Sequence, residues 1–202
     1  MHNLVFRRRE QKYLLTQAQR DALVRAVEEH MEPDDYGRSL VCNIYFDTPD
    51  HRLIRRSLEG PVYKEKLRLR GYGQIREGDK VFLEMKKKYN GIVYKRRVKL
   101  PVEMAMRYMA DPEAVLDKGQ IGRELDYFKR FYGQLRPAMY LSYDRLAWRL
   151  GDLRVTLDWN VRYRVQQLDL TVPPEGEQLL EAEQYLLEIK TATAMPLWLV
   201  EV

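Results

Sequence analysis

The sequence has almost none of the residues that cross-link a chain or cluster around a metal. Its 202 residues include one cysteine, Cys42, and three histidines, His2, His30 and His51. A single cysteine excludes an internal disulfide and a cysteine metal cluster, and the histidines lack the spacing of a metal site. One cysteine fits a reducing compartment, so we expect a cytoplasmic protein.

Long hydrophobic runs are absent as well. Only three apolar residues, 4–6, precede the arginines at 7–9, so no signal-peptide apolar region is present. The longest late apolar stretch, residues 195–200, contains Pro196 and is far too short to span a bilayer. We find no internal repeat, low-complexity tract or linker either. We therefore predict one domain over residues 1–202, with no membrane segment.

Charge, by contrast, is abundant, and its distribution matters more than its total. Charged residues make up 32% of the chain, and 35 Lys and Arg exceed 30 Asp and Glu by only five. Cations concentrate in residues 63–99, where turn signals at Gly78-Asp79 and Asn90-Gly91 separate three strand-like runs. Local clustering of this kind predicts a polyanionic partner, with phosphates as the first candidate.

Each of the three runs has a charged face and an apolar face when it is read at the period of a strand. The charged faces comprise Lys64, Lys66, Arg68 and Arg70, then Glu84, Lys86 and Lys88, then Lys95, Arg97 and Lys99. The apolar faces comprise Leu67 and Leu69, then Val81, Leu83 and Met85, then Tyr94, Val98 and Leu100. Any one of these cations is more often a solvated side chain than a ligand, and we interpret Lys87, Lys88 and Lys99 in that way.

The rest of the chain reads as strands with a few helices between them. Further strands are expected at residues 6–15, 40–47, 139–150, 153–165 and 185–191. Thr16 with Gln19 forms a capping box that starts a helix reaching about residue 30. A helical turn at 52–58 and a helical stripe at 125–135 complete the set. The pattern predicts an α+β, mainly β fold of about eight strands, and periodicity alone leaves open whether the sheet is open or closed into a barrel.

Eight short motifs occur in an informative order. They are RREQKY at 8–13, IYFDTP at 44–49, KLRLRGYG at 66–73, FLEMK at 82–86, YKRRV at 94–98, SYDR at 142–145, RVTLD at 154–158 and LEIK at 187–190. Together they resemble the VTC domain, the polyphosphate polymerase module of the vacuolar transporter chaperone complex and its bacterial relatives. This domain belongs to the triphosphate tunnel (CYTH-like) metalloenzymes. The resemblance implies an antiparallel eight-stranded tunnel barrel with a few helices packed outside.

The resemblance also implies roles for individual residues. The phosphate ligands that it implies are Lys12, Arg68, Arg70, Lys86, Lys95, Arg145 and Arg154, and among them Arg68, Arg70, Lys86, Arg145 and Arg154 are the expected catalytic residues. Strand alternation adds Arg97 and Lys190 as candidate phosphate ligands, and Lys66, which shares the face of Arg68 and Arg70, is a further candidate. Glu188 matches the acidic residue that holds a divalent metal, with Glu10 and Glu84 as further candidates. At the first position of the opening motif, Arg8 replaces the glutamate of the wider superfamily, as in the polymerase branch. From the resemblance we also expect this chain to lack the family's C-terminal closing helix.

The function implied by the resemblance is metal-dependent phosphoryl transfer. With Mn²⁺ or Mg²⁺ as cofactor, the γ-phosphate of ATP would pass to a growing inorganic polyphosphate chain. A hydrolase of the same fold, acting on tripolyphosphate or a nucleoside triphosphate, would use nearly the same residues. A non-catalytic polyphosphate-binding module is a third interpretation.

Two further alternatives concern the charged faces themselves. Glu188 and Lys190, taken alone, resemble an ordinary charge pair on a wet sheet surface. A basic sheet could also bind nucleic acid, but acidic residues interrupt these rows and most aromatics lie on the apolar faces rather than between the cations. We therefore expect no nucleic-acid partner.

Overall fold

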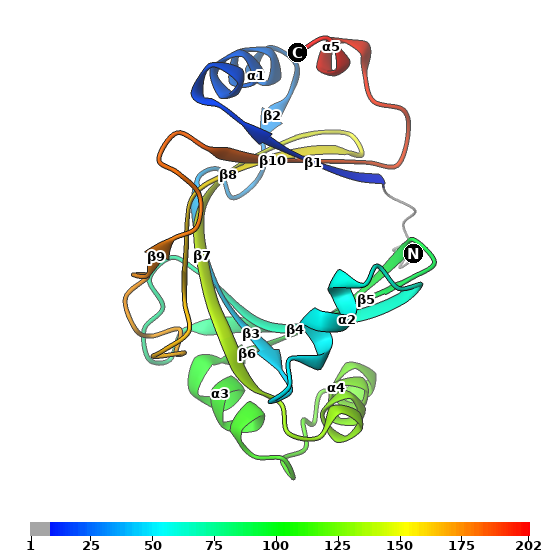
Figure 1. Ribbon diagram of the computed structural model, residues 1–202, viewed down its shortest axis with the longest axis vertical. Coiled ribbons are helices and arrows are strands. Elements are labelled where there is room, and N and C mark those ends of the chain that lie inside the picture. Colours follow the sequence, from blue (N-terminus) through cyan, green and yellow to red (C-terminus); the bar gives the residue numbers. More distant parts are fainter. Residues whose placement is uncertain (1–8) are drawn as a thin grey trace. The chain divides into compact units, whose positions relative to one another are not determined.

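A computed structural model describes residues 9–202 as two compact units that share three strands (Figure 1). Unit 1 comprises residues 9–41, Ser142–Arg162 and Glu177–Val202, and unit 2 comprises Cys42–Leu141 and Tyr163–Gly176. Strands β3 (Ser39–Asp47), β7 (Arg136–Leu150) and β8 (Leu153–Arg164) carry residues of both units. Each unit is built on an antiparallel sheet.

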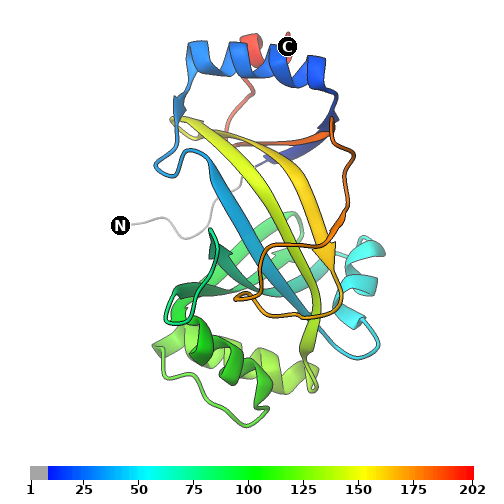
Figure 2. The same cartoon turned by 90° about the vertical axis from the view of Figure 1, so that its left-hand side faces the viewer.

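Unit 1 is a sheet with two helices on one face. Its strand order is β1-β10-β8-β7, and the two-residue strands β2 and β9 pair with β7 and β8. The remaining elements are β1 (Arg9–Leu15), α1 (Gln17–His30), β2 (Glu32–Pro33), β8 (Leu153–Arg164), β9 (Glu177–Gln178), β10 (Tyr185–Thr191) and α5 (Leu197–Val200). Helices α1 and α5 lie on the same side of β1, β10 and β8 (Figures 1 and 2).

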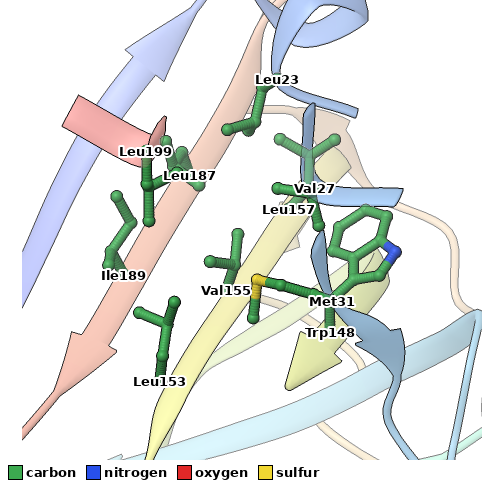
Figure 3. Close-up of a cluster of buried hydrophobic side chains, with 10 residues drawn as sticks. All are labelled: Leu23, Val27, Met31, Trp148, Leu153, Val155, Leu157, Leu187, Ile189 and Leu199. Atoms are coloured by element: carbon green, nitrogen blue, oxygen red, sulfur yellow. The ribbon is translucent and has the colours of Figure 1, made fainter. Parts of the chain in front are cut away.

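The core of unit 1 fills the space between these helices and the sheet (Figure 3). Alternate residues of β8 and β10, among them Val155, Leu157, Leu187 and Ile189, pack against residues of α1 such as Leu23. Because strand side chains alternate between faces, the residues between these apolar positions point to the opposite side of the sheet. That opposite face carries the charged side chains of unit 1.

Unit 2 follows the strand order β7-β3-β4-β5-β6. Its other elements are α2 (Arg52–Leu58), β4 (Tyr63–Tyr72), β5 (Lys80–Tyr89), β6 (Ile92–Pro101), α3 (Val102–Ala110) and α4 (Gly119–Tyr132). The β5–β6 turn places both Asn90 and Gly91 at positive φ, 45° and 80°, as a type I′ hairpin requires. Helix α3 packs on β5 and β6, and α4 packs on β6.

The alternation expected for the basic runs is confirmed. Leu67 on β4 and both Leu83 and Met85 on β5 are at most 1% exposed, so the apolar faces form the core of unit 2. The cationic residues between them point the other way. A one-residue slip of any strand would exchange the two faces, so burial of the leucines fixes the register of the charges.

Most predicted elements are confirmed, including the predicted mainly antiparallel fold. The expected capping box of Thr16 and Gln19 starts α1, and the turn at 52–58 is α2. Residues 9–202 contain five helices, two more than the three predicted: Pro112 follows α3 and separates it from α4, and the short α5 follows Pro196. Residues 6–8 of the first predicted strand, Arg8 included, lie outside the described residues.

Two expectations about the whole chain have different outcomes. Among residues 9–202, β1 pairs only with β10 and β6 only with β5, so hydrogen bonds do not close the strand order into the expected barrel. A single domain over 1–202 stays a prediction. Within the described residues, no helix is long and apolar enough to cross a membrane.

The core of unit 1 provides a first test. Leu157 is fully buried under α1, so Leu157→Ala removes buried methyl groups and leaves a cavity. We expect the free energy of unfolding to fall by about 2–5 kcal/mol in a urea titration. Leu197→Ala, at a side chain that is 77% exposed, is the matched control and should change it by less than about 0.5 kcal/mol. Equal effects of the two variants would contradict the described core.

Candidate functional site

The charged face of unit 2 is an ordered array of side chains on three neighbouring strands. Cross-strand partners form three rows, each read from β4 through β5 to β6: Lys66, Lys86 and Lys95; Arg68, Glu84 and Arg97; Arg70, Phe82 and Lys99. Six of the predicted phosphate ligands and one predicted metal ligand, Glu84, therefore lie on one sheet face. The sequence predicted which residues share a face, and the registers add which of them are neighbours.

Glu84 is the anion at the centre of this array. Its Oε2 accepts hydrogen bonds from Nη2 and Nε of Arg68 at 2.7 and 2.9 Å, and its Oε1 lies 2.7 Å from Nζ of Lys95. Burial alone would raise the pKa of Glu84, but the charges of Arg68 and Lys95 outweigh it and lower the pKa to about 2. The carboxylate is thus ionised at neutral pH and fixes two predicted phosphate ligands in place.

Two polar side chains of β3 hold the arginines of β4. Nη1 of Arg68 donates to the hydroxyl of Tyr45 at 3.1 Å, and Nε of Arg70 donates to Oδ1 of Asn43 at 2.9 Å. Asn43 is itself fixed, because its Nδ2 donates to the carbonyl of Leu141 at 3.1 Å. These contacts preorganise both guanidinium groups. Sequence analysis missed Asn43, and it had Tyr45 only as part of a motif.

The row of three lysines carries unfavourable charge. Lys66, Lys86 and Lys95 lie directly opposite one another on adjacent strands, an arrangement that destabilises a sheet by repulsion. Burial lowers the pKa of Lys95, and repulsion from Arg68 and Arg97 adds to this effect although Glu84 opposes it. A bound anion on this face would relieve the repulsion, so the array favours a polyanionic ligand.

The charged face of unit 1 has alternating signs. Across β1, β10 and β8 the register gives one row of Glu10, Lys190 and Arg154 and a second row of Lys12, Glu188 and Thr156. Nζ of Lys190 lies 2.6 Å from Oε2 of Glu188 and 3.8 Å from Oε2 of Glu10. Nζ of Lys12 lies 3.4 Å from Glu188 and 3.5 Å from Glu10. The two carboxylates and two ammonium groups form one network.

This network keeps Glu188 ionised. Burial would raise the pKa of Glu188, but attraction to Lys190 and hydrogen bonds from its neighbours hold the pKa far below its usual range. Burial would lower the pKa of Lys12, and the charges of Glu188 and Glu10 raise it instead. Glu188 therefore lies among cations that stabilise its charged form.

The two predicted arginines of unit 1 are also held by acids. Asp158, which is 5% exposed, accepts from Nε and Nη2 of Arg145 at 2.6 and 2.7 Å in a bidentate pair. Asp34 accepts from Nη2 of Arg154 at 2.7 Å. The sequence carried no signal for Asp34, because 120 positions separate it from Arg154.

The described residues contain no group of three or more His, Cys, Asp and Glu side chains arranged as a metal site. Glu10 and Glu188 are nevertheless close neighbours, and Mg²⁺ is commonly bound through one or two carboxylates with substrate phosphates completing the set. These two residues therefore fit a substrate-assisted metal site. Glu84 belongs to unit 2, and its two oxygens contact Arg68 and Lys95. The metal roles of all three acids stay predictions.

Solved structures define the fold class of the chain. A candidate adenylate cyclase from Bacillus halodurans is 16% identical, with a TM-score of 0.57 over 91% of this chain and 80% of that one. A candidate adenylyl cyclase from Hippeastrum, described as having a dominant triphosphatase activity, is 18% identical, with a TM-score of 0.54 over 92% of this chain and 79% of that one. The predicted triphosphate tunnel (CYTH-like) fold is confirmed.

The family follows from the sequence itself. Residues 7–202 match the VTC domain, and the chain belongs to that family. No curated protein matches the sequence. The resemblance based on the eight ordered motifs is therefore confirmed.

The buried charge of Glu84 gives a prediction about acid stability. Because its folded-state pKa of about 2 lies below the ordinary value of 4.5, its ionisation stabilises the fold above pH 4.5. This stabilisation, about 1–3 kcal/mol, is lost as pH falls from 4.5 toward 2. In Glu84→Gln, the free energy of unfolding should be lower than that of the wild type at pH 7. It should also fall less steeply than that of the wild type between pH 4.5 and 2.

Chemical denaturation at several pH values between 2 and 7 measures this difference, and the exposed Glu59→Gln variant controls for the change in net charge. If the free energy of unfolding falls equally steeply between pH 4.5 and 2 in the wild type and in Glu84→Gln, the described ion pairs are contradicted.

Proposed function

We propose that this protein carries out metal-dependent phosphoryl transfer, and specifically the ATP-dependent synthesis of inorganic polyphosphate. Membership of the VTC domain family supports the general chemistry of triphosphate handling. The single observation that carries the proposal is the array of unit 2, where six cations surround one buried carboxylate on a single sheet face. A phosphate chain has the charge density and the repeating oxygens that such an array can bind.

In this proposal the cations of unit 2 bind successive phosphates. Arg68 and Arg70 are two residues apart on one strand face, so their guanidinium groups can address neighbouring phosphates with paired hydrogen bonds. Lys66, Lys86 and Lys95 add ammonium donors in the adjacent row, and Arg97 lies beside Glu84. Glu84, Asn43 and Tyr45 act by orienting the arginines before the ligand arrives.

The residues of unit 1 supply the metal site and further cations. Glu188 and Glu10 would hold Mn²⁺ or Mg²⁺, and the bound ion would neutralise charge on phosphoryl oxygens. Lys12 and Lys190, which pair with these carboxylates, would then turn to phosphate oxygens. Arg145 and Arg154 of the same unit remain anchored on Asp158 and Asp34 and would offer charge to phosphate oxygens.

Phosphoryl transfer needs in-line positioning and stabilisation of the charge on the transferred group. The terminal phosphate of a polyphosphate chain, or orthophosphate, attacks the γ-phosphorus of ATP. The bond from this phosphorus to the β–γ bridging oxygen breaks, and ADP leaves with the electron pair of that bond. The arginines and lysines stabilise the transferred group through hydrogen bonds that are in place beforehand.

Hydrolysis of a triphosphate is the second candidate function. One structural relative is described as having a dominant triphosphatase activity. Water would replace phosphate as the acceptor, while the residues that bind the triphosphate would stay the same. The two functions therefore differ in product rather than in site.

The test uses purified protein with ATP and Mn²⁺, following ADP release and polymer formation on a gel. Polymer that requires the metal and disappears in Glu188→Ala would support the polymerase. Free phosphate without polymer would indicate the hydrolase. Retained binding of polyphosphate with neither product would overturn both activities and leave a binding module.

Arg70 provides a sharper prediction. Arg70→Ala removes a buried, preorganised charge and should lower turnover by about 100-fold or more. Lys88→Ala is the matched control, because Lys88 lies on the same sheet face but is solvent-exposed, and it should keep near-native turnover. Circular dichroism checks that both variants are folded. Near-native turnover in folded Arg70→Ala would remove Arg70 from the proposed site.

A further inference from the structure

Thr156 has a buried hydroxyl that the protein leaves without a partner. The residue lies on β8 and is 1% exposed. Within the part of the chain that the structure describes, its Oγ1 accepts and donates no hydrogen bond. A buried hydroxyl in this state destabilises a fold, and buried polar groups in native proteins nearly always have a protein, water or ligand partner. Something outside the described side chains is therefore expected to contact this oxygen.

The side chain of Thr156 points to the charged face of unit 1. Its neighbours Val155 and Leu157 pack into the cluster beneath α1 (Figure 3). Because side chains alternate along a strand, Thr156 lies on the opposite side of the sheet, together with Arg154 and Asp158. These two residues already make ion pairs there, with Asp34 and Arg145.

The strand register brings Thr156 next to Glu188. Thr156 on β8 lies directly opposite Glu188 on β10, which in turn lies opposite Lys12 on β1. Directly opposed residues of an antiparallel pair have Cβ atoms about 4.5–5.5 Å apart. The unpartnered oxygen is thus within side-chain reach of any ion that the Glu188 carboxylate holds.

We propose that Oγ1 of Thr156 is a third oxygen ligand, with Glu188 and Glu10, of the divalent cation. The inference rests on the proposed function, because it concerns the same metal. Mg²⁺ and Mn²⁺ prefer oxygen ligands, and a hydroxyl can offer a lone pair to the ion while its proton stays available to a phosphate oxygen. The two carboxylates alone form only an acidic pair. The buried, unpartnered hydroxyl opposite Glu188 adds a further oxygen that could bind the ion.

The competing explanation is that an ordered water bonds the Thr156 hydroxyl. The metal and the water explanations make opposite predictions for the stability of the metal-free protein. If a structural water bonds the hydroxyl, then Thr156→Val loses a bonding partner and the metal-free protein becomes less stable. If the hydroxyl is instead a metal ligand, it has no partner in the metal-free protein. Thr156→Val then replaces this unsatisfied group by a methyl of similar shape. The metal-free protein then keeps or gains stability while it loses affinity for the ion.

The experiment titrates Mn²⁺ alone into four full-length proteins and measures the concentration of free Mn²⁺ by electron paramagnetic resonance. The proteins are the wild type, Thr156→Val, Thr156→Ser and Glu188→Gln, the last marking loss of the site. We expect Thr156→Val to raise the Kd for Mn²⁺ about 10-fold or more, and Thr156→Ser, which keeps the hydroxyl, to stay near the wild type. Thermal unfolding without metal should give Thr156→Val a Tm no lower than that of the wild type.

Three results for the Thr156 variants would overturn the inference. These are an unchanged Kd in Thr156→Val, equal losses in the valine and serine variants, and a lowered metal-free Tm in Thr156→Val. Absence of any Mn²⁺ binding by the wild type would overturn it as well. Failure of the proposed function can be distinguished from failure of this inference. A wild type that binds Mn²⁺ as described, but forms no polymer and releases no phosphate from ATP, contradicts the proposed activity. The assignment of Thr156 as a metal ligand then still holds.

Discussion

Buried carboxylates that hold clustered cations are the constraint on which the rest of this structure depends. In unit 2, Glu84 is 2% exposed and contacts both Arg68 and Lys95. In unit 1, Glu188 contacts Lys12 and Lys190. Without these anions, rows of like charge on adjacent strands would repel one another. The acids therefore let a sheet carry a dense cationic face and stay folded.

The same contacts decide what the cations can do. An arginine whose guanidinium is fixed on Glu84, Asn43 or Asp158 loses little further freedom when a phosphate arrives. Such preorganised charge stabilises a phosphoryl group better than mobile surface lysines do. The apolar faces beneath contribute indirectly, because burial of Leu67, Leu83 and Val155 fixes the strand registers and hence the neighbours of every charge.

Sequence periodicity was sufficient for the strands and their faces, and the resemblance of the ordered motifs was sufficient for the family. The alternation of Lys66, Leu67, Arg68 and Leu69 predicts which side chains share a surface, and the order of the motifs predicts the fold class, which the family match and the solved relatives confirm. Such a pattern is local, so it carries no information about partners that are distant along the chain.

The residues that the sequence did not reveal are those whose roles depend on long-range pairing. Asn43 contacts Arg70 across 27 positions, and Asp34 contacts Arg154 across 120. Asp158 and Thr156 were visible only as members of the RVTLD motif at 154–158. Their chemistry emerges once the strand registers place them beside a charge. Two of the five helices among residues 9–202 were not predicted, namely α3, which Pro112 separates from α4, and the short α5.

Diffraction from crystals of the protein grown with tripolyphosphate and Mn²⁺ tests the central claim most directly. The claim is that the cationic strand faces bind a phosphate chain and are not merely solvated. The account predicts phosphate oxygens within hydrogen-bonding distance of Arg68 and Arg70, and an anomalous manganese peak on Glu188. Phosphate bound elsewhere, with no manganese on Glu188, would contradict it.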